Sequence, residues 1–148
     1  MSASPDALVA AARTLLRPAP GTVPTLAPAL RARAAAVLLR MALDAALDAY
    51  WRRITPSMTR IGKHRMLCLE WYAGQDTARR CRTTWAALSA ACHYRACELP
   101  PAPSEVCARL PEVTGLLAAL EVTAGREGAT DGWNGPVRPD QPVTGPTL

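Results

Sequence analysis

Basic side chains gather in two stretches of the sequence, and their chemistry is that of anion recognition. Residues 52–65 contain five of them and no acid, and residues 79–82 contain three more in the opening turns of a predicted helix. Guanidinium groups form forked hydrogen bonds to phosphate and carboxylate oxygens, and exposed N–H groups at a helix N-terminus attract the same anions. The candidate anion-binding residues are Arg52, Arg53, Arg60, Lys63, Arg65, Arg79, Arg80 and Arg82.

The abundance of arginine has two explanations that the sequence leaves open. The chain carries 17 basic and 12 acidic residues, and Lys63 is its only lysine. GC-rich codons raise Arg, Ala, Pro and Gly together, so genome composition is one explanation. The distribution favours the other, because residues 31–95 carry 12 basic and 4 acidic side chains, whereas residues 96–127 carry 2 basic and 5 acidic ones. This asymmetry predicts a basic face whose partner is nucleic acid or an acidic protein.

Aromatic residues are interleaved with the basic ones. Tyr50, Trp51, Trp71 and Tyr72 lie close in sequence to the two basic stretches, and nucleic-acid bases stack on such rings. The alternative is structural: in a chain without Phe, the tryptophans, including Trp85, are the large pieces that fill a core. Both interpretations stay open at this point.

Two His/Cys pairs have the spacing of metal ligands on one helix face, His64 with Cys68 and His93 with Cys97. The predicted helices that carry them reverse near residue 75, which separates the pairs by roughly 16 Å along the bundle. We therefore expect no metal site. The sequence also has no glycine-rich phosphate loop, nucleophile elbow or Cys-x-x-Cys pair, so we expect no cofactor.

Asp44 and Asp48 share one face of a predicted helix, which is the arrangement of paired acid–base or metal-binding carboxylates. Arg40 and Arg52 extend the same line at four-residue spacing. The pattern therefore predicts a solvated, salt-bridged face.

Proline divides the chain into helical segments. Pro56 is the only proline between residues 29 and 99, and Leu and Ala far outnumber the β-branched residues, so helix is favoured over strand. We predict helices over residues 5–17, 26–53, 57–73 and 76–97 and a fifth from Ser104, with side-chain caps at Ser4, Asp76 and Ser104, a stop at Gly74 and a bend at Pro111. In the second helix, three- and four-residue spacing predicts a buried stripe of Leu30, Ala34, Val37, Leu38, Met41 and Ala45.

Short connections at residues 54–57 and 74–76 make the middle helices antiparallel neighbours. The predicted fold class is all-α: a four- to five-helix antiparallel bundle with a disordered C-terminal tail. We assign residues 1–24 to a short helix and a proline-rich linker, residues 25–124 to the bundle domain and residues 125–148 to the tail. The tail is rich in Gly and Pro and offers Trp133 and little else for burial.

The sequence predicts a cytoplasmic protein that does not enter the membrane. Its N-terminus has no basic region of the kind that opens a secretory signal. The most apolar stretch, residues 34–50, contains three charged residues and does not qualify as a membrane span. An odd number of cysteines, five, without an export signal is typical of reduced thiols.

The stretch WAALSAACHYRACELPP, which carries His93, is similar to segments of small helical proteins from GC-rich bacteria. A small helical bundle with a basic face and a His near the end of a long helix resembles the HEPN group of helical domains. Many of these are ribonucleases or toxin components. Their motif, an Arg followed after four to six residues by His, is missing, because Arg60 and His64 have three residues between them.

Three functional hypotheses follow. The first is a binding module without enzymatic activity, whose basic face takes nucleic acid or an acidic protein. The second, implied by the HEPN resemblance, is a ribonuclease-like effector in which His93 acts as acid and base while Arg79 and Arg82 stabilise phosphate charge. The third is a structural subunit that buries its apolar faces in a homo-oligomer.

Overall fold

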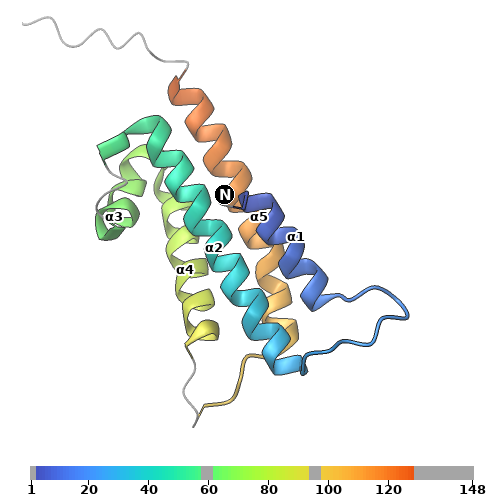
Figure 1. The fold of residues 1–148 in the computed structure, drawn as a ribbon. Helices are drawn as coiled ribbons and strands as arrows, with labels where there is room; N and C mark the ends of the chain where they lie inside the picture. Colours follow the sequence, from blue (N-terminus) through green and yellow to red (C-terminus); the bar gives the residue numbers. More distant parts are fainter. Residues whose placement is uncertain (1–2, 58–61, 94–97, 129–148) are drawn as a thin grey trace, which may run out of the picture.

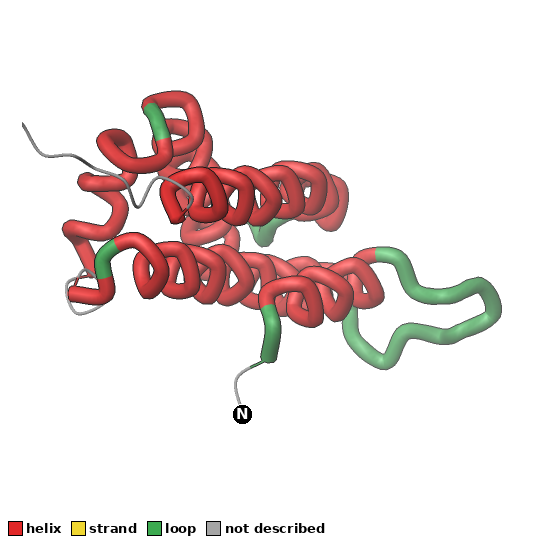
Figure 2. Tube along the Cα trace, turned by 90° about the horizontal axis from the view of Figure 1, so that it is seen from above, coloured by secondary structure: helices red, strands yellow, loops and turns green. Residues whose placement is uncertain are grey.

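The protein is built from α-helices. The computed structural model describes residues 3–57, 62–93 and 98–128, and within these ranges it contains no strand. The five helices are α1 (Pro5–Leu16), α2 (Pro28–Ile54), α3 (Gly62–Ala73), α4 (Gln75–Cys92) and α5 (Pro103–Gly128). The predicted all-α fold is confirmed (Figure 2). Among the described residues, no helix combines the length and the apolar character needed to cross a membrane.

Helix α2 is the centre of the bundle, because α1, α4 and α5 all pack against it (Figure 1). It runs in the same direction as α5 and antiparallel to α1 and α4 (Figure 1). Its buried face alternates fully buried alanines with Leu39 and Leu43, which are 0% exposed. Leu88 of α4 and Leu116 of α5 complete this core. Helix α3 lies outside the group of four and packs mainly on α4.

Helix α1 is part of the bundle, which therefore includes residues from the segment 1–24 as well as the predicted bundle domain, residues 25–124. Leu8, Val9 and Ala12 are buried against α2 and α5. The start of α1 is as predicted: the Ala7 N–H donates to the Ser4 hydroxyl at 3.2 Å, and a proline occupies the first turn.

The predicted caps at Asp76 and Ser104 were wrong. Gly74, with a positive φ of 87°, is the single residue between α3 and α4, and it precedes α4 without a side-chain cap. Asp76 lies inside the first turn of α4. At the start of α5, the Ala102 N–H donates a hydrogen bond to the Glu105 carboxylate at 3.3 Å. The side chain that accepts a backbone hydrogen bond at this helix end is therefore Glu105 and not Ser104.

Helix α5 is longer than predicted. It is not split at Pro111, which lies inside the helix, and it includes residues 125–128, which we had assigned to the tail. The remainder of the predicted disordered tail, with Trp133, lies outside the described residues. The same is true of residues 58–61 and 94–97, which were predicted to belong to the third and fourth helices.

The predicted buried stripe of α2 is on the wrong face. Leu30 and Met41 are each 51% exposed and Val37 is 39% exposed. The face that packs against α1 and α5 is offset from it and contains Leu39 and Leu43. Alanines occur all around this helix, so apolar periodicity alone fits two faces, and the positions of α1 and α5 decide between them.

Substitution on the two faces of α2 distinguishes these alternatives. We expect Leu43→Ala to lower the free energy of unfolding by about 2–5 kcal/mol, because it leaves a cavity in the core. Met41→Ala should lower it by less than about 1 kcal/mol, because this side chain is half exposed. Urea denaturation followed by circular dichroism measures both values. Equal losses, or a larger loss for Met41→Ala, would contradict this packing.

Candidate functional site

Arg65, a predicted anion-binding residue, instead forms ion pairs with other residues of the protein. Its guanidinium lies 3.0 Å from an Asp44 carboxylate oxygen and also pairs with Asp48. Its side chain is only 16% exposed. The two carboxylates therefore face α3 rather than forming a solvated line with neighbours on α2, and Arg65 fastens α3 to α2.

The three arginines at the start of α4 remain on the surface. Arg79 is 72% exposed and lies 2.9 Å from Asp76, whose other oxygen is 3.9 Å from Arg80. Arg82 is 41% exposed and lies 3.7 Å from Glu70 of α3. Ion pairs this exposed are worth about 0–1 kcal/mol, so these guanidinium groups can exchange partners readily.

Arg80 is directed differently from its neighbours. Its Nη2 atom would lie 3.2 Å from a Cβ atom added to Gly115, so this side chain extends over α5. Arg82 faces α3, where it meets Glu70, and Arg79, three residues earlier, lies on the adjacent side of α4. The three arginines of α4 therefore do not form one cluster, because Arg80 extends over α5 whereas Arg82 contacts α3.

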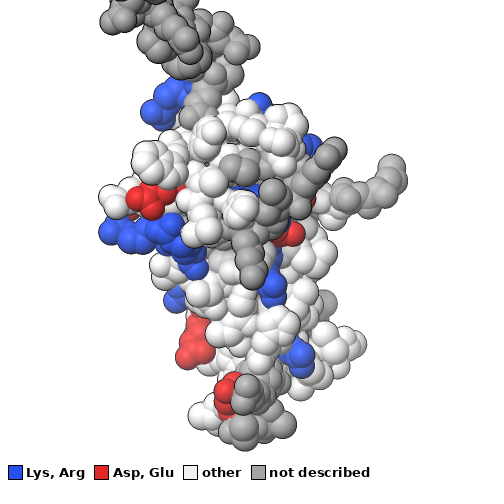
Figure 3. Space-filling view, turned by 90° about the vertical axis from the view of Figure 1, so that its left-hand side faces the viewer, with Lys and Arg blue, Asp and Glu red and all other residues white. Residues whose placement is uncertain are grey.

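The remaining predicted basic residues are dispersed. Arg52 and Arg53 are exposed in the last turn of α2, where the helix dipole favours cations. Arg53 lines a groove between α2 and α5. Arg60 lies outside the described residues, and so does the side chain of Lys63. On the face drawn in Figure 3, the described Arg side chains form separate groups with acids nearby.

His93 belongs to a different surface. Its Nε2 atom lies 2.9 Å from Nη1 of Arg40, and because a guanidinium only donates, Nε2 of His93 is the acceptor of this hydrogen bond. The Arg40 guanidinium also stacks 4.9 Å above the Trp85 ring, which is a cation–π contact. With Arg33, these residues line a shallow hollow of about 380 Å³ between α2 and α4. This role of Arg40 was not predicted, because nothing in the local spacing links it to His93, 53 residues away.

The residues of the ribonuclease hypothesis are not brought together. Arg79 and Arg82 lie near the start of α4, whereas His93 follows its last residue. At 1.5 Å per residue, His93 is about 16 Å from Arg82 and about 21 Å from Arg79 along the helix. A single phosphate group cannot contact all three.

The tryptophans differ in exposure. Trp51 is fully buried and meets the Tyr72 ring edge-on at 5.3 Å, so it belongs to the core. Trp71 of α3 is 89% exposed, and Leu67, one turn earlier on the same helix, is 64% exposed. The core interpretation therefore holds for Trp51 and does not hold for Trp71.

Cys81 and Cys92 are buried and serve as packing residues. Burial raises the pKa of the Cys81 thiol from 9.0 to about 11, although Arg80 and Arg82 oppose this shift. Burial also raises the pKa of Cys92, against the opposing charge of Arg40. Neither forms a thiolate near neutral pH, and thiolates are what nucleophilic catalysis and metal binding require. No three His, Cys, Asp or Glu side chains within the described ranges are grouped to hold a metal ion.

Comparison with known proteins does not extend this description: no protein-family model, curated protein or solved structure matches the chain.

Removing the Arg65 charge should destabilise the fold. We expect Arg65→Met to lower the free energy of unfolding by about 1–3 kcal/mol, because it leaves Asp44 and Asp48 facing α3 without their partner. Arg82→Met, at an exposed pair, should lower it by less than about 1 kcal/mol. In a protein that already carries Asp44→Asn and Asp48→Asn, Arg65→Met should lower the free energy of unfolding by less than it does in the wild type. Denaturation of the wild type, Arg65→Met, the double Asn variant and the triple variant measures this coupling. Additive losses would show that Arg65 acts independently of both carboxylates.

Cys81 makes stability depend on pH in the alkaline range. The unfolded chain loses the thiol proton near pH 9, whereas the folded chain keeps it to about pH 11. Because the unfolded state binds fewer protons between these values, the free energy of unfolding should fall across this window by about 3 kcal/mol. Denaturant titrations at pH 8 and pH 10.5 test this. Cys81→Ala should reduce the fall, and Met41→Ala, a control that removes no titratable group, should not.

Proposed function

We propose that the protein binds single-stranded nucleic acid at the surface where α3 meets the start of α4. This α3–α4 surface consists of Leu67 and Trp71 on α3 and of Arg79 and Arg82 on α4. The observation that carries the proposal is the 89% exposure of Trp71 beside a helix that presents two exposed guanidinium groups.

The two helices are held in register at this surface. Gly74 is the only residue between α3 and α4, and Arg82 lies 3.7 Å from Glu70, the residue before Trp71. Arg79 is one turn nearer to the connection than Arg82. An aromatic ring and two cations are therefore offered together from rigid elements, and a strand that stacks a base on the ring has phosphates within reach of both guanidinium groups.

The energies of these interactions favour such a ligand. Stacking of one base on an aromatic side chain contributes about 1–3 kcal/mol. Asp76 and Glu70 hold Arg79 and Arg82 by exposed pairs worth about 0–1 kcal/mol, so phosphates can replace them. Asp76 and Glu70 weaken the attraction of this surface for polyanions, but they do not prevent Arg79 and Arg82 from binding phosphates.

Single-stranded nucleic acid fits this surface better than the alternatives. An acidic protein would use the arginines but offers Trp71 no characteristic partner, and a duplex keeps its bases stacked on one another. The ribonuclease hypothesis requires His93, which lies about 16 Å from Arg82 along α4. We also propose a cytoplasmic location, where free thiols such as Cys68 and Cys107 persist.

Charge reversal at the α3–α4 surface tests the proposal. We expect Arg79→Glu with Arg82→Glu to weaken binding of a labelled 20-nucleotide single strand more than tenfold at 50 mM salt. The control is Arg13→Glu on α1 with Arg17→Glu directly after it, which makes the same change in net charge at exposed positions and should weaken binding much less. The salt dependence should also become shallower by about 1.4 in log–log slope, because two fewer phosphates are neutralised. Fluorescence anisotropy at several salt concentrations measures both.

Trp71→Ala separates stacking from charge. It should weaken single-strand binding about 5- to 100-fold, in proportion to one missing stacking interaction, and leave the salt slope unchanged. Duplex of the same sequence should bind less tightly and respond little to Trp71→Ala. Equal affinities of all variants would overturn the proposal, and tighter binding of polyglutamate than of oligonucleotide would favour an acidic protein partner.

A further inference from the structure

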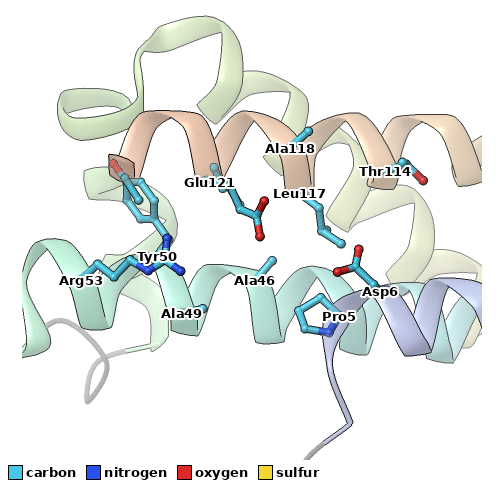
Figure 4. A pocket seen from close by; sticks show the side chains of 12 residues that line it. Pro5, Asp6, Ala46, Ala49, Tyr50, Arg53, Thr114, Leu117, Ala118 and Glu121 are labelled. Carbon is cyan, nitrogen blue, oxygen red and sulfur yellow. The ribbon is translucent and has the colours of Figure 1, made fainter. Parts of the chain in front are cut away.

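A groove lies on the side of α2 away from α3. It runs between α2 and α5 and is closed at one end by the first turn of α1 (Figure 4). Its volume is about 250 Å³. Drug-sized ligands occupy pockets of roughly 300–1,000 Å³, so this groove suits a smaller molecule. Its apolar surface is formed by Ala46, Ala49, Leu117 and Ala118.

Two carboxylates line this apolar groove. Asp6 comes from α1 and Glu121 from α5, and both side chains point into the space between α2 and α5 (Figure 4). Neither forms an ion pair or a side-chain hydrogen bond with another described residue. Both residues are exposed, so water reaches the two carboxylates, and a cation placed between them would replace this water with charge-assisted hydrogen bonds.

Arg53 gives the groove a direction. It lies at the end nearest the C-terminus of α2, beside Tyr50, whereas Asp6 lies beyond Ala46 toward the other end (Figure 4). A bound cation is repelled by Arg53 and attracted by Asp6 and Glu121, so the charged group of a ligand belongs at the α1 end. The stretch between the two ends is apolar and suits a hydrocarbon chain.

We infer that this groove binds a small organic cation with an apolar body, of the alkylammonium or arylammonium class. The ammonium group donates hydrogen bonds to Asp6 and Glu121, and the hydrocarbon covers Ala46, Ala49 and Leu117. This site is separate from the α3–α4 surface, and its existence does not depend on nucleic-acid binding.

Three ligands of equal chain length and different charge test the inference: hexylammonium, hexanol and hexanoate. By NMR titration of the full chain, hexylammonium should bind at least tenfold more tightly than hexanol, and hexanoate should bind most weakly. Asp6→Asn with Glu121→Gln should remove the preference for hexylammonium over hexanol. Glu70→Gln with Asp76→Asn, the same charge change on α3 and α4, should retain it.

A second pair of variants tests the place of binding without altering charge. Ala118 is exposed and lines the groove, so Ala118→Leu should fill the space and weaken hexylammonium binding at least fivefold while the chain stays folded. Ala108→Leu, at an exposed position earlier on α5, is the matched control and should have no effect. Absence of hexylammonium binding to the folded wild type overturns the inference. If hexanol binds as tightly as hexylammonium, the inference is overturned in favour of an uncharged ligand. If hexanoate binds more tightly than hexylammonium, it is overturned in favour of an anion at Arg53.

Discussion

The close packing of helices around α2 is the constraint on which the rest of the structure depends. Ala32, Ala35, Ala36 and Ala42 are all 0% exposed, and such small side chains let neighbouring helices approach this face closely. Three helices share this one partner, so α2 has no room on its buried face for a fourth. Helix α3 is therefore held at the edge of this group, where it adds Leu69 to the core.

Attachment at the edge explains why α3 carries both a structural charge and an exposed aromatic ring. Leu69 is buried and Arg65 reaches Asp44 and Asp48, so one side of this helix is fixed to the bundle. Trp71 takes no part in this attachment and is 89% exposed. The ion pairs thus position the very surface on which the proposed function rests, although they contribute nothing to its charge.

The helices could be predicted from local signals, but the contacts between them could not. Proline spacing, the Ser4 cap and the turn at Gly74 act within a few residues, and each was identified from the sequence. In contrast, Arg65 and Arg79 look alike in sequence, and only the position of α2 makes one an internal ion pair and the other a surface group. The same dependence on distant partners determines which face of α2 is buried.

The packing of α2 also separates the two proposed sites. In Figure 1, α3 and α1 lie on opposite sides of α2, so the arginines of α4 and the carboxylates of the groove face different solvent regions. Screening at physiological salt acts over about 8 Å, so charges on the two surfaces affect each other weakly. Close-packed cores resist small deformations, which makes a mechanical link between the sites equally weak. A chain with an overall charge of +5 can therefore present a cation-binding groove and an anion-binding surface at once, because local geometry, and not net charge, sets the potential at each.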